Sequence, residues 1–240
     1  GGNIIQGKSC GLSVTVIGDG NQCLGRRGAK GIQVGDAIYV SGFLGDGAAG
    51  LNYARSEPQE LNKHQATLRA AYYCPAPRVL LGQQLHGIAK AVIDISDGLL
   101  SDLQHILDLN QDQPGTKTGN KTGNKTGNKT GNKTGNKTGN KTGNKIGAEI
   151  SLAKLPYSQA ILAETSEGER QDYALNGGDD YELLMIVAPS EQAKLEQLGC
   201  ICQLTHIGTI TSATSGVQVV GIGAAGEKLS LRQKGYKHFG

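Results

Sequence analysis

Two short acidic segments contain the side chains best suited to chemistry. The first, Asp94-Ile95-Ser96-Asp97-Gly98, ends an apolar stretch, and a helical pattern follows it at once. Two carboxylates and a hydroxyl are thereby concentrated at the C-terminal end of a predicted strand. Carboxylates in this position can ligate Mg²⁺, which prefers oxygen ligands and keeps several waters and substrate phosphates. The alternative is structural: Ser96 or Asp97 caps the helix and Asp94 bonds a turn.

The second segment, Asn176-Gly177-Gly178-Asp179-Asp180-Tyr181-Glu182, places two glycines before acids at the start of an apolar strand. Glycines allow the backbone to be approached closely, and paired acids at a strand entry are unfavourable unless they bind something. Two such segments in one chain indicate metal–phosphate chemistry. A solvated turn is the alternative for each.

Alternating and amphipathic segments predict the elements that position these acids. Strands are predicted over 12–17, 37–41, 89–95, 148–152, 181–187, 202–209 and 217–220, and helices over 46–55, 59–73, 78–88, 99–109, 158–165 and 191–198. Because strands and helices interleave over the whole length, the fold class is α/β or α+β.

A tetrapeptide repeat dominates the charge of the 240-residue chain. Residues 118–145 are seven copies of Thr-Gly-Asn-Lys, and the whole chain has a net charge of +3. Without the 7 Lys of the repeat, 17 Lys and Arg face 21 Asp and Glu, which gives the remaining 212 residues a net charge of −4. This acidic body argues against nucleic-acid binding. The repeat has no apolar side chain, so we predict that 113–146 is a disordered insertion.

Other features exclude further classes. No apolar run approaches the roughly 20 residues that span a bilayer, so we expect no transmembrane helix. No basic-then-apolar leader opens the chain, so we expect no secretory signal unless an earlier part of the chain has been lost. The five cysteines are scattered. Cys200 and Cys202 are the only close pair, and the chain lacks the second cysteine pair or the histidine pair that a zinc site needs. Free thiols in a reducing cytoplasm are the expected state of these cysteines.

Two glycine motifs match binding patterns that their contexts reject. Gly2 to Ser9 satisfies the P-loop pattern, but a predicted strand follows it where the phosphate-binding helix should begin. Gly45 to Gly50 satisfies the dinucleotide pattern, but 59–73 reads as helix where a second strand should present an acidic residue. We interpret the second motif as a glycine-rich helix start.

The two acidic segments, together with Lys234-Gly235-Tyr236-Lys237-His238-Phe239, resemble thiamine-monophosphate kinases of the aminoimidazole-ribonucleotide-synthetase-like superfamily. Further matching blocks are 26–30, 35–42 and 77–79, in the order of that family. The resemblance implies transfer of the γ-phosphoryl group of ATP to thiamine monophosphate, giving thiamine diphosphate with Mg²⁺ and no covalent intermediate. It also implies a cytoplasmic enzyme, and a homodimer for full-length members, an expectation that does not extend to this chain.

The resemblance assigns roles to residues that match the family's motifs, with no catalytic residue separate from the ligands. ATP-binding residues would be Gly2, Asn3, Arg26 and Ser96, metal ligands Asn3, Asp94 and Asp97, and thiamine-phosphate contacts Asp179 and Tyr236. An aromatic ring such as that of Tyr236 can stack on a ligand ring.

The chain departs from the family at three places. Asn3 stands where a metal-binding Asp is usual, and Asp179 stands where Glu is usual. Roughly the first third of the family's chain is missing, which leads us to expect weak activity or none. We therefore predict that 1–35 is a remnant of the N-terminal ATP- and Mg²⁺-binding, dimerising domain, and that 36–240 is the C-terminal domain of mixed sheet and helices.

Two other readings remain open from the sequence. The chain could be another ATP-dependent enzyme of the superfamily, such as a selenophosphate synthetase or a hydrogenase-maturation protein. It could also be a non-catalytic remnant, which Asn3, Gln6 and the missing third favour.

Overall fold

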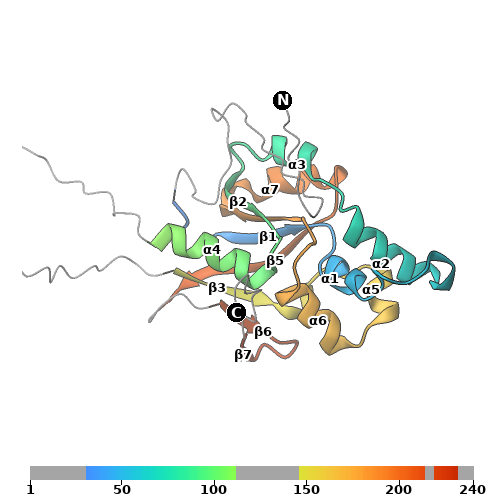
Figure 1. The fold of residues 1–240 in the computed structure, drawn as a ribbon. Coiled ribbons are helices and arrows are strands. Elements are labelled where there is room, and N and C mark those ends of the chain that lie inside the picture. The colour runs from blue at the N-terminus through green and yellow to red at the C-terminus, as the bar shows by residue number, and fades with distance from the viewer. Residues whose placement is uncertain (1–30, 112–145, 214–218, 232–240) are drawn as a thin grey trace, which may run out of the picture.

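The described part of the chain is centred on a seven-stranded sheet in the order β2-β4-β1-β5-β3-β6-β7 (Figure 1). The computed structural model describes residues 31–111, 146–213 and 219–231. The strands are β1 (Ala37–Ser41), β2 (Ala89–Asp94), β3 (Ile146–Ser151), β4 (Leu183–Val187), β5 (Leu204–Ser212), β6 (Val219–Ile222) and β7 (Lys228–Ser230). Neighbours pair antiparallel except β3 and β6, which are parallel, so the sheet is mixed.

Seven α-helices belong to the described ranges. They are α1 (Asp46–Leu51), α2 (Lys63–Tyr73), α3 (Val79–Gln84), α4 (Leu99–Gln111), α5 (Gln159–Glu164), α6 (Glu167–Asn176) and α7 (Gln192–Gln197). Short 3₁₀ turns lie at Pro58–Glu60, Leu152–Lys154, Pro189–Glu191 and Leu198–Cys200. None of these helices is long and apolar enough to cross a bilayer.

Both faces of the central strands are buried, as the alternation along β1 shows. Ile38 and Val40 join the core beneath α4, whereas Ala37 and Tyr39 join a second core formed with α3 and α7. All five residues of β1 are buried, so neither face of this strand is exposed to water. The sheet is therefore the middle of three layers.

The helix α4 covers one face through a stripe of apolar residues at helical spacing. Its buried apolar side chains are Leu99, Leu100, Leu103, Ile106 and Leu107. This i, i+4, i+7, i+8 pattern defines one side of a helix that faces a core. The packing fixes the start of α4, and with it the acidic segment that joins it to β2.

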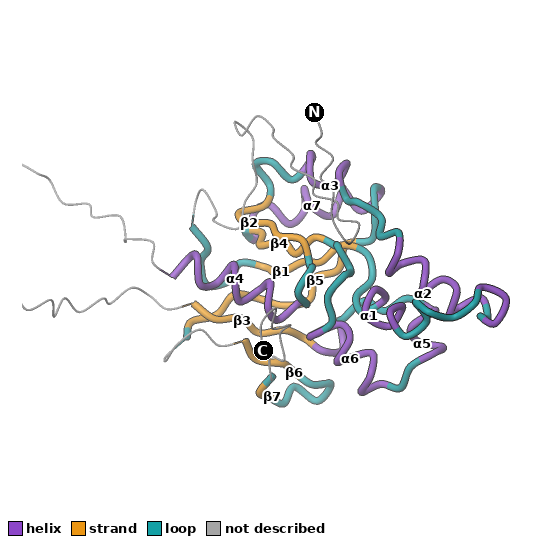
Figure 2. Tube along the Cα trace, in the orientation of Figure 1, coloured by secondary structure: helices purple, strands orange, loops and turns teal. Residues whose placement is uncertain are grey.

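A separate group of helices lies at one end of the sheet. α1, α2, α5 and α6 are drawn together on the right of Figure 2, and their mutual packing includes Ala49, Leu68 and Ile161. The helices α2 and α6 each begin with a capping box, at Asn62 and Ser166. This group forms one wall of the candidate site.

The mixed α/β class expected from the sequence is confirmed, and the elements differ from expectation in a few places. The helix α6 and strand β7 were not predicted, and α1 ends at Leu51 rather than at residue 55. The repeat lies between a helix and a strand, as expected, but 112–145 is outside the described residues. The predicted strand 12–17 and the P-loop match at Gly2 to Ser9 also lie outside them.

Candidate functional site

The two acidic segments meet side by side, because β2 and β4 are adjacent antiparallel strands. The pairing places Asp94 opposite Leu183. It continues beyond both strands: Ile95 N–H donates to the Glu182 carbonyl at 2.8 Å, and Tyr181 N–H donates to the Ile95 carbonyl at 2.9 Å. The N–H of Asp179 then reaches the Ser96 carbonyl at 3.1 Å. Residues about 85 positions apart in sequence are thus joined through their backbones.

Glycines make this close approach possible. A Cβ at Gly178 would overlap the carbonyl oxygen of Ser96. Gly98 has φ of +100°, and a Cβ there would come 2.8 Å from the carbonyl carbon of Asn176. Any larger residue at Gly178 would therefore push the two segments apart.

The second segment alternates between outward and inward side chains. Asp179 and Tyr181 adopt the left-handed region, with φ of 66° and 52°. Their side chains are partly exposed, and the Tyr181 hydroxyl donates to Asp179 Oδ1 at 3.1 Å. Asp180 and Glu182 are buried. Positive φ is unusual for residues other than glycine, and such residues concentrate at binding sites.

The inward side chains bind the body of the protein. Asp180 accepts the N–H groups of Gly45 at 2.7 Å and Gly47 at 3.0 Å, at the start of α1. These amides are therefore occupied, which agrees with rejecting the dinucleotide motif there. Glu182 accepts Arg78 Nε at 2.6 Å and the hydroxyl of Ser41.

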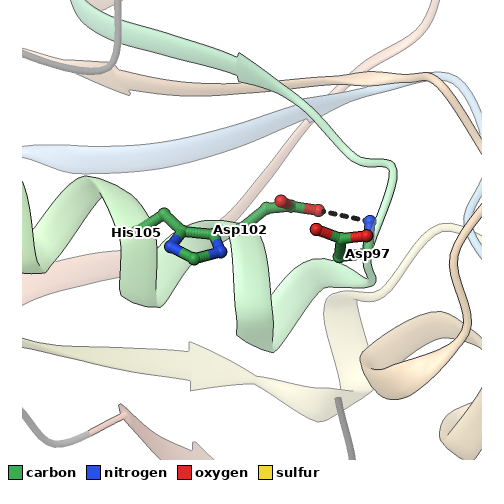
Figure 3. Close-up of side chains that lie close together, drawn as sticks. All are labelled: Asp97, Asp102 and His105. Carbon is green, nitrogen blue, oxygen red and sulfur yellow. Dashed lines mark hydrogen bonds between the residues drawn. The ribbon is translucent and has the colours of Figure 1, made fainter. Parts of the chain in front are cut away.

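The first segment is fixed by a carboxylate from α4. Oδ2 of the buried Asp102 accepts the N–H groups of both Ser96 and Asp97 at 3.0 Å. Figure 3 draws the bond from the Asp97 N–H. His105, one turn further along α4, is exposed. Ligand atoms of Asp97, Asp102 and His105 lie within 4.8 Å of one another, the one such group of three among the described residues.

A cavity of about 760 Å³ opens where the two segments meet α1, α2 and α6. Its lining combines carboxylates, tyrosines and small residues, and contains no Lys or Arg among the described residues. The lining residues are Ala48, Leu51, Asn52, Tyr72, Ser96, Asp97, Asp172, Tyr173, Asn176, Gly177, Gly178, Asp179 and Tyr181.

Burial raises the pKa of several acids around this cavity. The pKa of Asp180 rises to about 7, mainly through desolvation, although the amides of Gly45 and Gly47 lower it. Desolvation also raises the pKa of Asp102, against the lowering effect of its two backbone hydrogen bonds. The pKa of Asp46 rises for the same reason, while its bond from Ser158 opposes the rise. Burial therefore favours the protonated form of these three carboxyl groups.

The residues predicted from sequence fall into two groups. Ser96, Asp97 and Asp179 line the cavity, and Asp94 is exposed at the end of β2, outside the lining set. Gly2, Asn3, Arg26 and Tyr236 lie outside the described residues, so their roles stay predictions.

Four residues at or beside the cavity were missed. Three of them belong to the helices α2 and α6: Tyr72, Tyr173 and Asp172. The fourth is Asp102, whose hydrogen bonds to the first acidic segment were not predicted. One usable signal was Ser166-Glu167-Gly168-Glu169, a capping-box pattern that marks the start of α6. A second usable signal was the position of Asp102 in the first turn of α4, where a carboxylate can accept backbone N–H groups.

The donor set fits a hard divalent cation at the Ser96–Asp97 end. Carboxylate and hydroxyl oxygens from Asp94, Ser96 and Asp97 are the ligand type that Mg²⁺ prefers. The rigid turn beneath them fixes the direction of Asp97. The described lining supplies no positive side chain that could pair with a phosphate group.

Comparison with known proteins gives one consistent set of relatives. No protein-family profile matches the sequence. The chain is 34% identical over 200 residues to the thiamine-monophosphate kinase of Haemophilus influenzae, and the matched region covers 82% of this chain and 49% of that protein. It is 33% identical over 221 residues to the thiamine-monophosphate kinase of Escherichia coli K12, covering 91% and 56%.

Solved structures agree with these relatives. The thiamine-monophosphate kinase of Stenotrophomonas maltophilia K279a matches with a TM-score of 0.62 and 31% identity, over 83% of this chain and 53% of that one. AaThiL complexed with AMPPCP and TMP matches with a TM-score of 0.61 and 26% identity, over 90% and 54%. The hydrogenase maturation protein HypE of E. coli, at 20% identity and a TM-score of 0.54, shares the fold. The chain spans about half the length of the relatives it matches.

Proposed function

The chain is a relative of the thiamine-monophosphate kinases over about half of their length, and we propose that it serves the same reaction. That reaction transfers the γ-phosphoryl group of ATP to the phosphate of thiamine monophosphate. The proposal includes ATP and thiamine monophosphate as ligands, Mg²⁺ as the metal and a cytoplasmic location. Support comes from the relatives' names and from the AaThiL complex with AMPPCP, an ATP analogue, and TMP.

One observation carries the proposal: Ser96, Asp97 and Asp179 line a single cavity. We assign nucleotide and metal to the first two residues and thiamine phosphate to the third, as the family resemblance implies. Donor and acceptor phosphates must lie in line for direct transfer, so their binding residues must share one site. The backbone bond from Asp179 to Ser96 holds the two ends together at 3.1 Å.

The charge of the cavity suits this pair of ligands. Mg²⁺ held by Asp94 and Asp97, with Asn3 as a further proposed ligand, would neutralise phosphate charge. The chain's own residues then bind and orient: Ser96 offers a hydroxyl to the nucleotide, and Asp179 faces the acceptor side.

The opposite wall fits the organic part of the acceptor. Thiamine monophosphate carries a positively charged thiazolium ring. Tyr72 and Tyr173 offer aromatic faces, and Asp172 adds negative charge. A cation is attracted to aromatic faces within about 6 Å, and a carboxylate strengthens the attraction. We assign this wall to the ring system, with Tyr236 as an additional contact.

The remaining assignments complete the proposal. Gly2, Asn3 and Arg26 would contact ATP, and the boundary near residue 35 would separate them from the C-terminal domain. Replacing the family's Asp by Asn3 removes a charge from the metal site, so we expect weak nucleotide binding and slow turnover.

Calorimetry with Mg·AMPPCP and with thiamine monophosphate tests this function, followed by a coupled assay of ADP release. We expect both ligands to bind, and ADP release to require thiamine monophosphate. Asp97→Asn should weaken nucleotide binding, and Asp179→Asn should weaken thiamine monophosphate binding, each by about tenfold, since one charged contact is lost.

Asp108→Asn is the matched control, because this residue is exposed in the last turns of α4 and bonds only Gln104 in the hydrogen bonds described. Binding of neither ligand by the wild-type chain would contradict the proposal and favour a non-catalytic remnant. Nucleotide binding without thiamine monophosphate binding would favour another enzyme of the same fold.

A further inference from the structure

Two buried carboxylates beside the site have no role in the reaction as proposed above. Asp102 is 1% exposed and Asp180 is 9% exposed. Burying a carboxylate is unfavourable unless hydrogen bonds compensate it. Each of the two accepts two backbone N–H groups from a segment that forms the site, and the two do so with different geometry.

Asp102 uses one oxygen for both bonds. Its Oδ2 accepts the N–H groups of Ser96 and Asp97, each at 3.0 Å. These amides belong to the turn that directs the hydroxyl and carboxylate toward the cavity. The side chain therefore fixes the metal end of the site from beneath, five to six residues further along the chain.

Asp180 uses both oxygens. Its Oδ2 accepts Gly45 N–H at 2.7 Å and its Oδ1 accepts Gly47 N–H at 3.0 Å. This holds the start of α1 against the segment that carries Asp179. The contact is tight, because a Cβ at Gly47 would overlap the carbonyl oxygen of Asp179. The next turn of α1 supplies Ala48 and Leu51 to the cavity.

We propose that Asp102 and Asp180 are positioning residues, which hold the metal end and the substrate end of the site through their backbone hydrogen bonds. The proposal rests on the proposed function for the identity of the two ends. Neither carboxylate need touch a ligand. Asp180 has both oxygens engaged within the protein, and Asp102 lies below the turn that it binds.

The competing role for Asp102 is that of a metal ligand. Its carboxylate lies within 4.8 Å of ligand atoms of Asp97 and His105 (Figure 3). An amide side chain separates the two roles. Asn at 102 keeps one oxygen, which can accept both N–H groups, but it removes the negative charge that strengthens metal binding by a carboxylate. A positioning role predicts that Asp102→Asn keeps Mg·AMPPCP binding. A role as metal ligand predicts that Asp102→Asn weakens this binding.

The same change has the opposite outcome at 180. Asn at 180 replaces one of the two accepting oxygens by an NH₂ group, which would face a backbone N–H donor. One of the two α1 amides would then lose its partner. Asp180→Asn should therefore lose one of its two backbone hydrogen bonds, whereas Asp102→Asn should keep both, although each variant removes one negative charge.

The test combines ligand binding with amide hydrogen exchange, at pH 8 so that Asp180 is ionised. The variants are Asp102→Asn, Asp102→Ala, Asp180→Asn and Asp180→Ala, with Asp97→Asn and the exposed Asp108→Asn as references. The probes are Mg·AMPPCP and thiamine monophosphate. Exchange is followed at the amides of Ser96, Asp97, Gly45 and Gly47.

We expect Asp102→Ala to speed exchange at Ser96 and Asp97 and to weaken Mg·AMPPCP binding, each by about tenfold, as loss of two hydrogen bonds implies. Asp102→Asn should stay within about threefold of wild type in both, because its bonds are kept. Both changes at 180 should speed exchange at Gly45 and Gly47 and weaken thiamine monophosphate binding by about tenfold.

Three results would overturn the proposal: Asp102→Asn as weak in nucleotide binding as Asp97→Asn, Asp102→Ala equal to wild type, or unchanged exchange in Asp180→Asn. If the alanine variants do not fold, scalar couplings across the hydrogen bonds in the wild-type chain decide. Coupling from these amide nitrogens to the two carboxylate carbons supports the proposal, and its absence contradicts it. Wild-type chain that binds no ligand contradicts the proposed function, while exchange still tests the positioning.

Discussion

The two ends of the site are built in different ways. The proposed metal end, residues 94–102, holds its turn through a local contact, because the Asp102 carboxylate lies only five to six residues beyond the amides that it binds. The substrate end, residues 177–182, depends on distant partners. Its Asp180 binds amides more than 130 positions earlier, and its Glu182 binds Arg78, 104 positions earlier.

This difference locates the sensitivity of the site. The metal end requires a helix and a turn, which form from neighbouring residues. The substrate end requires that β1, α1 and the loop before α3 all reach their places, and it contains two residues with positive φ. Long-range contacts of this kind are lost together when a domain loosens. We therefore expect perturbations to reach the substrate end first.

The largest expected effect is a pH dependence that belongs to the substrate end. The pKa of Asp180 is about 7 in the folded chain and 3.8 in a solvated carboxyl. Between these values the unfolded chain releases the proton and the folded chain keeps it, so stability falls as pH rises from about 4 to about 7. The loss is at most about 4 kcal/mol.

Urea unfolding at several pH values measures this loss as the difference between wild type and Asp180→Asn, which has no carboxyl there to titrate. Asp108→Asn serves as the control and should follow wild type. A wild-type curve parallel to that of Asp180→Asn between pH 4 and 7 would show that Asp180 does not carry the effect.

Gly178→Ala should separate the two ends. Its new methyl group would overlap the carbonyl oxygen of Ser96, so the backbones must move apart at a cost of about 3 kcal/mol, as in other overpacked sites. Thermal unfolding measures the loss, and thiamine monophosphate binding should weaken with it.

The matched control is Gly168→Ala in α6, where a Cβ would meet nothing within 4 Å. Alanine should be neutral there or stabilise the helix by up to about 1 kcal/mol. Equal stability of the two variants would mean that the segments do not touch at Gly178.

Glu182→Ala should cost about 2 kcal/mol, because it leaves the partly buried Arg78 without its carboxylate. The arginine side chain is 25% exposed, so water replaces part of the lost interaction. Chemical denaturation measures the loss.

The control is Lys194→Ala, which breaks an exposed ion pair with Glu191 and should change stability by less than about 0.5 kcal/mol. Similar values for the two variants would contradict the buried role of Glu182.

The sequence predicts the metal end far better than the substrate end. An apolar strand, an acidic turn and an amphipathic helix follow one another along the chain, so their geometry is local. The adjacency of β2 and β4 could not be predicted, because it depends on the order of strands in the sheet, which brings together segments far apart in sequence. The start of the predicted strand at 181 was wrong by two residues, because the left-handed backbone at Tyr181 delays β4 until Leu183.

The aromatic wall was beyond the sequence for the same reason. Tyr72 and Tyr173 lie on helices about 100 positions apart, and the helix α6 that carries Tyr173 was not predicted. The burial of Asp180 was also hidden, because two adjacent aspartates look equivalent in the sequence, whereas in the structure Asp180 is buried and Asp179 is partly exposed.

The central claim is that the two acidic segments form one binding site in this chain. Amide NMR spectra recorded during titration with Mg·AMPPCP and thiamine monophosphate test it most directly. The resonances of Ser96 and Asp97 should shift with the nucleotide, those of Asp179 and Tyr181 with thiamine monophosphate, and each ligand should perturb the other's segment. Shifts confined to one segment, or absent from both with either ligand, would contradict the claim.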